Sequence, residues 1–126
     1  MFKVNYSGVV ESGNFEPLPA GDYSVVIGRV ETVKTLKGDP MVKVRYNVIN
    51  GEYDGRVLFD NVVIFGGNKP GAGMTKHFLH VIEEQYDGEF EIVPSNWVGK
   101  KLNVVLKVDE KYNNNKVTER KEYMPF

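Results

Sequence analysis

The sequence has no cysteine, only one tryptophan, and no apolar run near the roughly 20 residues that cross a bilayer. Without cysteine there is no disulfide, no thiol catalysis and no zinc or iron–sulfur site with cysteine ligands, which fits a reducing compartment. The first residues, Met1 to Tyr6, lack the long apolar stretch of a signal peptide. We therefore expect a cytoplasmic protein that does not contact a membrane.

A large net charge is also missing, since 16 basic and 17 acidic residues give a formal net charge of -1. The charges are nevertheless segregated: residues 77–96 carry five acidic and no Lys or Arg side chains, whereas residues 97–126 carry seven basic and four acidic ones. Electrostatic fields act locally, over a Debye length of about 8–10 Å. The near-neutral total therefore does not exclude a polyanion such as nucleic acid as a ligand.

What is present is the composition of one ordinary globular domain. The chain has 126 residues, of which 41% are hydrophobic and 26% charged. We expect residues 1–126 to form a single domain with an N-terminal arm over about residues 1–21, where glycine and proline interrupt the apolar positions. No internal repeat or second domain is indicated.

Three strands are predicted in the first half of the chain. β-Branched residues dominate Tyr23 to Val33, and Gly28 in their middle predicts a bulge or sharp bend. Met41 to Ile49 alternates between apolar and polar residues, so one face of this strand is buried and the other is wet. Arg56 to Phe65 is apolar on both faces, which leaves two alternatives open: both faces are covered, or aromatic rings are displayed.

The second half predicts a helix and two more strands. A helix is expected over Met74 to Gln85, and Glu89 to Val93 indicates a brief extended segment. A strand follows Trp97 with Leu102, Val104, Leu106 and Val108 alternating inward. The asparagines at positions 113–115 favour a tight turn, after which Val117 to Met124 returns as the antiparallel partner.

This order predicts a mainly β protein: a five-stranded OB-fold barrel with one α-helix between strands three and four. In that architecture oligonucleotides lie across strands two and three with flanking loops.

Five segments, in this order and spacing, also resemble a known family. They are Leu18-Pro19-Ala20-Gly21-Asp22-Tyr23, Thr35-Leu36-Lys37-Gly38-Asp39-Pro40, Gly51-Glu52-Tyr53-Asp54-Gly55-Arg56, Lys76-His77-Phe78-Leu79 and Trp97-Val98-Gly99-Lys100-Lys101. The family comprises small phage and prophage proteins, long catalogued as a domain of unknown function and regarded as recombination-associated single-stranded DNA-binding proteins. The resemblance implies a role in phage DNA replication or recombination in the cytoplasm of the bacterial host, with a phage recombinase or replication protein as partner.

Single-stranded DNA binding requires cations that follow the phosphates and flat rings on which bases stack. The expected cations are Lys34, Lys37, Lys43, Arg45, Arg56, Lys107, Lys111 and Lys116. The expected stacking rings are Tyr53, Phe59 and Tyr112. The alternative for each is an ordinary solvated cation or a core ring, and for Trp97 we favour packing. We expect these cations to form one groove.

The other motifs are weaker indications of function. His77 and His80 stand at helical spacing with Glu84 one turn beyond His80, but no HExxH pattern supports a metal site. The glycines of residues 66–73 lack the spacing of a phosphate-binding loop, so a mobile loop is expected. No acid, base and nucleophile are placed together. We therefore expect no enzyme activity, no metal and no cofactor.

A second function remains open: a phage interaction module whose apolar third strand and terminus dock a recombinase, helicase or virion component. The terminal Met124-Pro125-Phe126 resembles the apolar-Pro-Phe tip with which bacterial single-stranded DNA-binding proteins recruit partners, although the acidic tail that precedes such a tip is missing. The tip could instead close the barrel. A homo-oligomer is compatible with the sequence, which does not define the oligomeric state.

Overall fold

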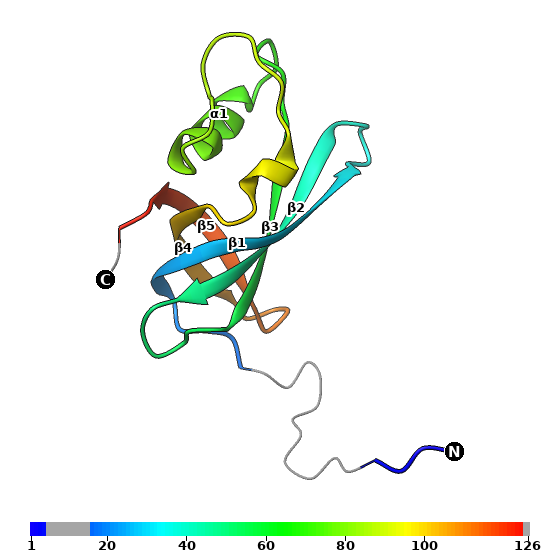
Figure 1. The fold of residues 1–126 in the computed structure, drawn as a ribbon, viewed down its shortest axis with the longest axis vertical. Helices are drawn as coiled ribbons and strands as arrows, with labels where there is room; N and C mark the ends of the chain where they lie inside the picture. The colour runs from blue at the N-terminus through cyan, green and yellow to red at the C-terminus, as the bar shows by residue number, and fades with distance from the viewer. Residues whose placement is uncertain (5–15, 125–126) are drawn as a thin grey trace.

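The computed structural model describes residues 1–4 and 16–124, and within these ranges five strands form one antiparallel sheet with the order β3-β2-β1-β4-β5 (Figure 1). The strands are β1 (Gly21–Lys34), β2 (Pro40–Ile49), β3 (Val57–Val63), β4 (Lys101–Asp109) and β5 (Asn114–Glu122). Between β3 and β4 lie the helix α1 (Ala72–Val81) and the short 3-10 helix η1 (Pro94–Trp97). No helix in the described ranges is long and apolar enough to span a membrane.

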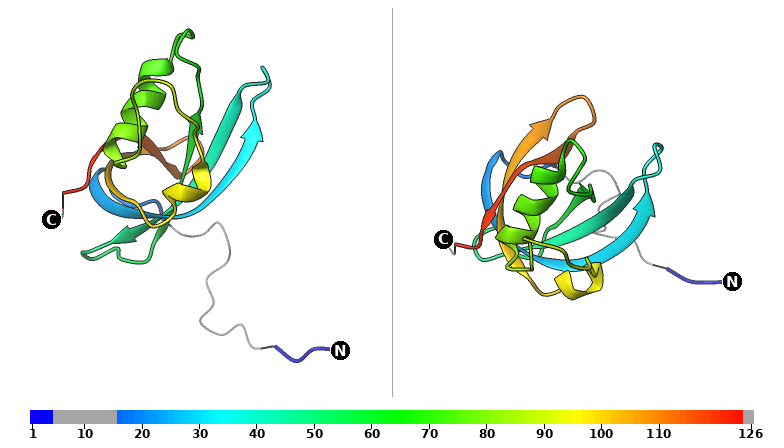
Figure 2. Two further views of the ribbon diagram at one scale, coloured as in Figure 1. Left: turned by 45° about the horizontal axis from the view of Figure 1, so that its top comes forward. Right: turned by 90° about the horizontal axis from the view of Figure 1, so that it is seen from above.

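The core lies inside the curve of the sheet. Seen from above, α1 lies over the opening that the strands surround (Figure 2). The ring of Phe78 on α1 packs against Trp97, with the ring centroids 5.1 Å apart, and Trp97 is completely buried. The packing role expected for Trp97 is confirmed. Leu18 is also buried and exchanges backbone hydrogen bonds with the side chain of Asn115, so part of the expected N-terminal arm packs into the domain.

The two edge strands, β3 and β5, are joined through side chains. Asp60 on β3 forms an ion pair with Arg120 on β5, whose Nε donates to Asp60 Oδ2 at 2.9 Å. The hydroxyl of Tyr46 on β2 donates to the same oxygen at 2.7 Å. We call Tyr46, Asp60 and Arg120 the edge clasp. Five strands with a helix between the third and fourth are therefore confirmed, whereas a closed barrel is not, because the described sheet ends at β3 and β5.

Because the phenol of Tyr46 is buried, the stability of the protein is expected to vary with pH in the alkaline range. Burial foremost, and then the Asp60 carboxylate, raise the pKa of Tyr46 well above its ordinary value of about 10. Above that pH the unfolded chain loses a proton that the folded chain retains, so the free energy of unfolding falls as the pH rises. We expect Tyr46→Phe to reduce this fall, measured by urea unfolding between about pH 8 and pH 11. Tyr112→Phe, at an exposed position, serves as control. An unchanged pH dependence in Tyr46→Phe would contradict the assignment.

The bulge predicted in the first strand is confirmed. The register of β1 against β2 shifts between Ile27 and Arg29, which leaves Gly28 as the extra residue. A Cβ atom at Gly28 would lie 2.5 Å from Nδ2 of Asn47, so only glycine fits while Asn47 keeps its place.

The predicted end of the helix was wrong, since α1 stops at Val81 and not at Gln85. Glu83 adopts a left-handed conformation with φ of 61°, and its N–H donates to the carbonyl of His80 while that of Glu84 donates to Leu79. This is the Schellman arrangement that ends a helix, usually at glycine. Glutamate at that position gives no sequence signal for a stop.

Residues 89–93, expected to form a brief extended segment, lie outside the five strands, and Phe90 and Ile92 pack against the core from this segment. One further prediction differs from the structure. Val108, expected to point inward, is 38% exposed because it lies opposite Asn115 near the end of the β4–β5 hairpin, beyond the core.

Candidate functional site

The outer face of β1, β2 and β3 carries two rows of side chains in cross-strand register. In the first row Arg29 lies opposite Arg45, which lies opposite Phe59, and in the second Glu31, Lys43 and Asn61 are aligned in the same way. All six line one hollow on this face. We call this set of six residues the three-strand face. The structure thus brings together three predicted site residues, Lys43, Arg45 and Phe59.

Arg29 belongs to this face because of the bulge. Val25 and Ile27 are buried, so strict alternation would turn Arg29 inward as well. The extra residue at Gly28 reverses the alternation and places Arg29 opposite Arg45. Arg29 and Asn61 were not among the site residues predicted from the sequence. The predicted bulge was the available signal for Arg29, whereas Asn61 became recognisable only once the pairing of β3 was known.

The arginine pair is electrostatically unsatisfied. Like charges directly opposite each other on an antiparallel pair destabilise the sheet. Within the described part of the chain neither guanidinium forms an ion pair, and Nε of Arg45 is buried without a hydrogen-bond partner. An anion placed between the two side chains would supply the missing negative charge.

Phe59 is displayed rather than packed. Its neighbours Leu58 and Asp60 are buried, but Phe59 itself is 72% exposed on the outer face of an edge strand. Of the two alternatives for the third strand, display of an aromatic ring is the correct one. A flat apolar ring next to Arg45 is the combination on which a nucleobase can stack while its phosphate meets a cation.

The remaining predicted cations lie elsewhere. Lys34 and Lys37 are exposed at the β1–β2 hairpin. Lys107 lies opposite Lys116 on β4 and β5, and Nζ of Lys111 lies 5.3 Å from the ring centroid of the exposed Tyr112. In the view from above, the ends of the two hairpins stand on either side of β3 (Figure 2). The cations are therefore spread over both halves of the sheet, with the three-strand face on one half.

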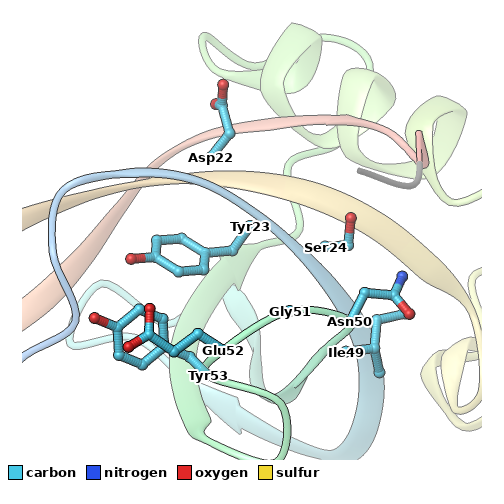
Figure 3. A pocket seen from close by; sticks show the side chains of 8 residues that line it. All are labelled: Asp22, Tyr23, Ser24, Ile49, Asn50, Gly51, Glu52 and Tyr53. Carbon is cyan, nitrogen blue, oxygen red and sulfur yellow. The ribbon is translucent and has the colours of Figure 1, made fainter.

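Tyr53 and Arg56 lie near the β2–β3 loop beside a different pocket, lined by Asp22, Tyr23, Ser24 and residues 49–53. Figure 3 shows the rings of Tyr23 and Tyr53 on one side of this pocket, and their centroids are 6.1 Å apart in an edge-on contact. Arg56 donates to the carbonyl of Glu16 at 2.8 Å. Tyr53 is thus half-buried against another ring and does not present a free platform.

The charge of this loop pocket disfavours an anionic ligand. Among the described residues, its ionisable lining groups are Asp22, Glu52 and two phenols, and no described Lys or Arg side chain lines it. Burial first, and then Tyr53 and Glu52, raise the pKa of Tyr23 against the opposing charge of Arg56. The three-strand face is therefore the stronger candidate for a polyanion.

The histidines of α1 contact different partners. His80 stacks on Tyr86 with centroids 4.4 Å apart and lies 3.3 Å from Glu122, while Nε2 of His77 lies 2.9 Å from the carbonyl of Arg120. Glu84 pairs with Lys100 at 3.3 Å. In the described ranges no three acidic or histidine side chains converge in a way that could hold a metal ion.

The end of the chain is held at Met124. The backbone N–H of Met124 donates to Oδ1 of Asn103 at 3.2 Å, and Nδ2 of Asn103 donates to the carbonyl of Met124 at 2.8 Å. Pro125 and Phe126, the rest of the tip considered for partner recruitment, lie outside the described residues.

Comparisons with known proteins give a family without an activity. Residues 2–126 match the sequence model of the family described as "Protein of unknown function (DUF669)". No curated protein matches the sequence.

Proposed function

The chain belongs to the DUF669 family, whose description names no activity, and we propose from its surface that it binds single-stranded DNA without sequence preference. The resemblance to recombination-associated phage proteins supports a role in phage DNA replication or recombination. The strand order and the helix between β3 and β4 support an OB-type barrel in which the edge clasp, rather than a backbone ladder, joins the edges.

One observation carries the proposal: Arg29, Arg45 and Phe59 stand in one cross-strand row with no carboxylate pairing the two arginines in the described chain. A phosphate relieves the repulsion between the guanidinium groups and accepts hydrogen bonds from both. The exposed ring of Phe59 lies one strand away, where it can receive an unstacked base. A row with cations at one end and a ring at the other matches a nucleotide.

The ring also favours single over double strands. In a duplex the bases are stacked on each other and paired, so their faces are not available to Phe59. Duplex DNA can meet only the cations, and it loses the contribution of about 1–3 kcal/mol that each base stacked on an aromatic ring makes.

The proposal is tested by fluorescence anisotropy of a labelled oligothymidine. Trp97 is completely buried, so its emission does not report on the three-strand face. Two phosphates, one shared by Arg29 and Arg45 and one at Lys43, predict a slope of about -1.4 in a plot of log affinity against log salt. We expect a mixed-sequence oligonucleotide to bind with similar affinity and a duplex more weakly. No binding at low salt, or equal affinity for duplex, would overturn the proposal.

A further inference from the structure

We infer that the bound strand runs along β2, with its phosphates over β1 and β2 and its bases turned toward β3. This inference rests on the proposed function and adds an orientation to it. It follows from the positions of the side chains in the two rows of the three-strand face. The cations lie on β1 and β2, whereas the aromatic ring and the amide lie on β3.

Both rows have their charged residues on β1 and β2 and their uncharged residue on β3. Every cation of the face is on β1 or β2, namely Arg29, Lys43 and Arg45, whereas β3 contributes the uncharged Phe59 and Asn61. Adjacent strands are about 4.8 Å apart, so each β3 side chain lies a short lateral step from the cation beside it. A DNA strand running along a row, and so across the three β-strands, would place phosphates against Phe59. A strand running along β2 keeps every phosphate beside a cation.

The spacing along β2 suits successive phosphates. Arg45 and Lys43 are two residues apart on the same face, which is about 6.7 Å. Stacked B-form DNA rises about 3.4 Å per nucleotide, and unstacking the bases lengthens this step. One phosphate therefore lies between Arg29 and Arg45 and the next at Lys43.

The second row also limits where the sugar–phosphate backbone of the DNA can lie. Glu31 on β1 lies opposite Lys43, and its carboxylate repels a phosphate from β1 at that point, which leaves the position over β2. On the other side of Lys43, the amide of Asn61 offers a donor and an acceptor to the edge of the second base. Because an amide can satisfy either pattern by turning over, this contact does not select one base.

The test compares an octamer of thymidine with an octamer of abasic residues that has the same phosphates. We expect Phe59→Leu to weaken binding of the thymidine octamer about 10-fold, the loss of one stacked base, and to leave binding of the abasic octamer unchanged. Arg45→Met is expected to weaken both octamers by the same factor and to make the salt slope shallower by less than about 0.7, because Arg29 still contacts the phosphate that the two arginines share. Phe2→Leu, at an exposed ring outside the three-strand face, is the matched control and leaves both affinities unchanged.

Three other outcomes would contradict either the orientation of the DNA strand or the proposed function. If Phe59→Leu weakens both octamers equally, Phe59 does not contact bases and the orientation is wrong, although binding by the wild type keeps the proposed function standing. If Arg45→Met affects only the thymidine octamer, Arg45 contacts bases rather than phosphates and the orientation is again wrong. If the wild type binds neither octamer at low salt, the proposed function itself fails.

Discussion

Replacing Asp60 with alanine lowers the free energy of unfolding by about 3–5 kcal/mol, the cost of removing one partner from a buried ion pair. Asp60 accepts hydrogen bonds from the hydroxyl of Tyr46 and from Arg120, and it also accepts from the backbone N–H of Asn61 at 2.9 Å. Its side chain is 6% exposed and that of Arg120 is 19% exposed, so water replaces little of what is lost. Since the clasp joins the two sheet edges, its loss weakens the whole curved sheet.

Urea unfolding at neutral pH measures this effect, and a variant already unfolded without urea counts as the larger loss. Lys69→Met is the matched control, because it breaks the 2.6 Å ion pair with Asp39 at a position where Lys69 is 53% exposed. Exposed pairs contribute about 0–1 kcal/mol. If Asp60→Ala costs no more than Lys69→Met, the clasp does not hold the edges together.

The edge clasp also shows where prediction from sequence ends. The inward face of the second strand, with Tyr46 on it, is predicted by simple alternation, because a strand buried on one side must repeat with period two. Asp60 and Arg120 are 60 residues apart, and nothing local indicates that they meet. Their contact depends on the curvature of the complete sheet, which no periodicity of a single segment encodes.

The residues of the three-strand face also differ in whether local sequence is enough to predict that they are exposed there. Lys43 and Arg45 were predictable because they alternate with buried valines on one strand. Arg29 was not, because one glycine determines whether it faces the core or the solvent, and the exact position of the register shift comes from pairing with β2. The exposure of Phe59 could not be decided in an apolar segment until one face of β3 was seen to be buried.

Replacing Arg29 with glutamate weakens binding of oligothymidine about 100-fold and at the same time stabilises the fold. The new carboxylate lies directly opposite Arg45, so a repulsive pair becomes an attractive one, which contributes about 0.2–1 kcal/mol to stability. Binding suffers twice, because one cation is lost and the new carboxylate repels the phosphate beside Arg45. Two charge-assisted contacts of about 1.5 kcal/mol each correspond to the expected factor.

Lys107→Glu provides the matched control, since Lys107 lies directly opposite Lys116 on β4 and β5. It makes the same change of charge in the same cross-strand geometry, but on the other half of the sheet. We expect a similar gain in urea resistance and less than about a threefold change in affinity, because Lys107 is not among the described residues that line the hollow of the three-strand face. Equal loss of affinity in the two variants would mean that net charge, and not the row formed by Arg29, Arg45 and Phe59, attracts the DNA. A loss confined to Arg29→Glu, in a protein made more stable by the change, separates binding from folding because the two effects have opposite signs.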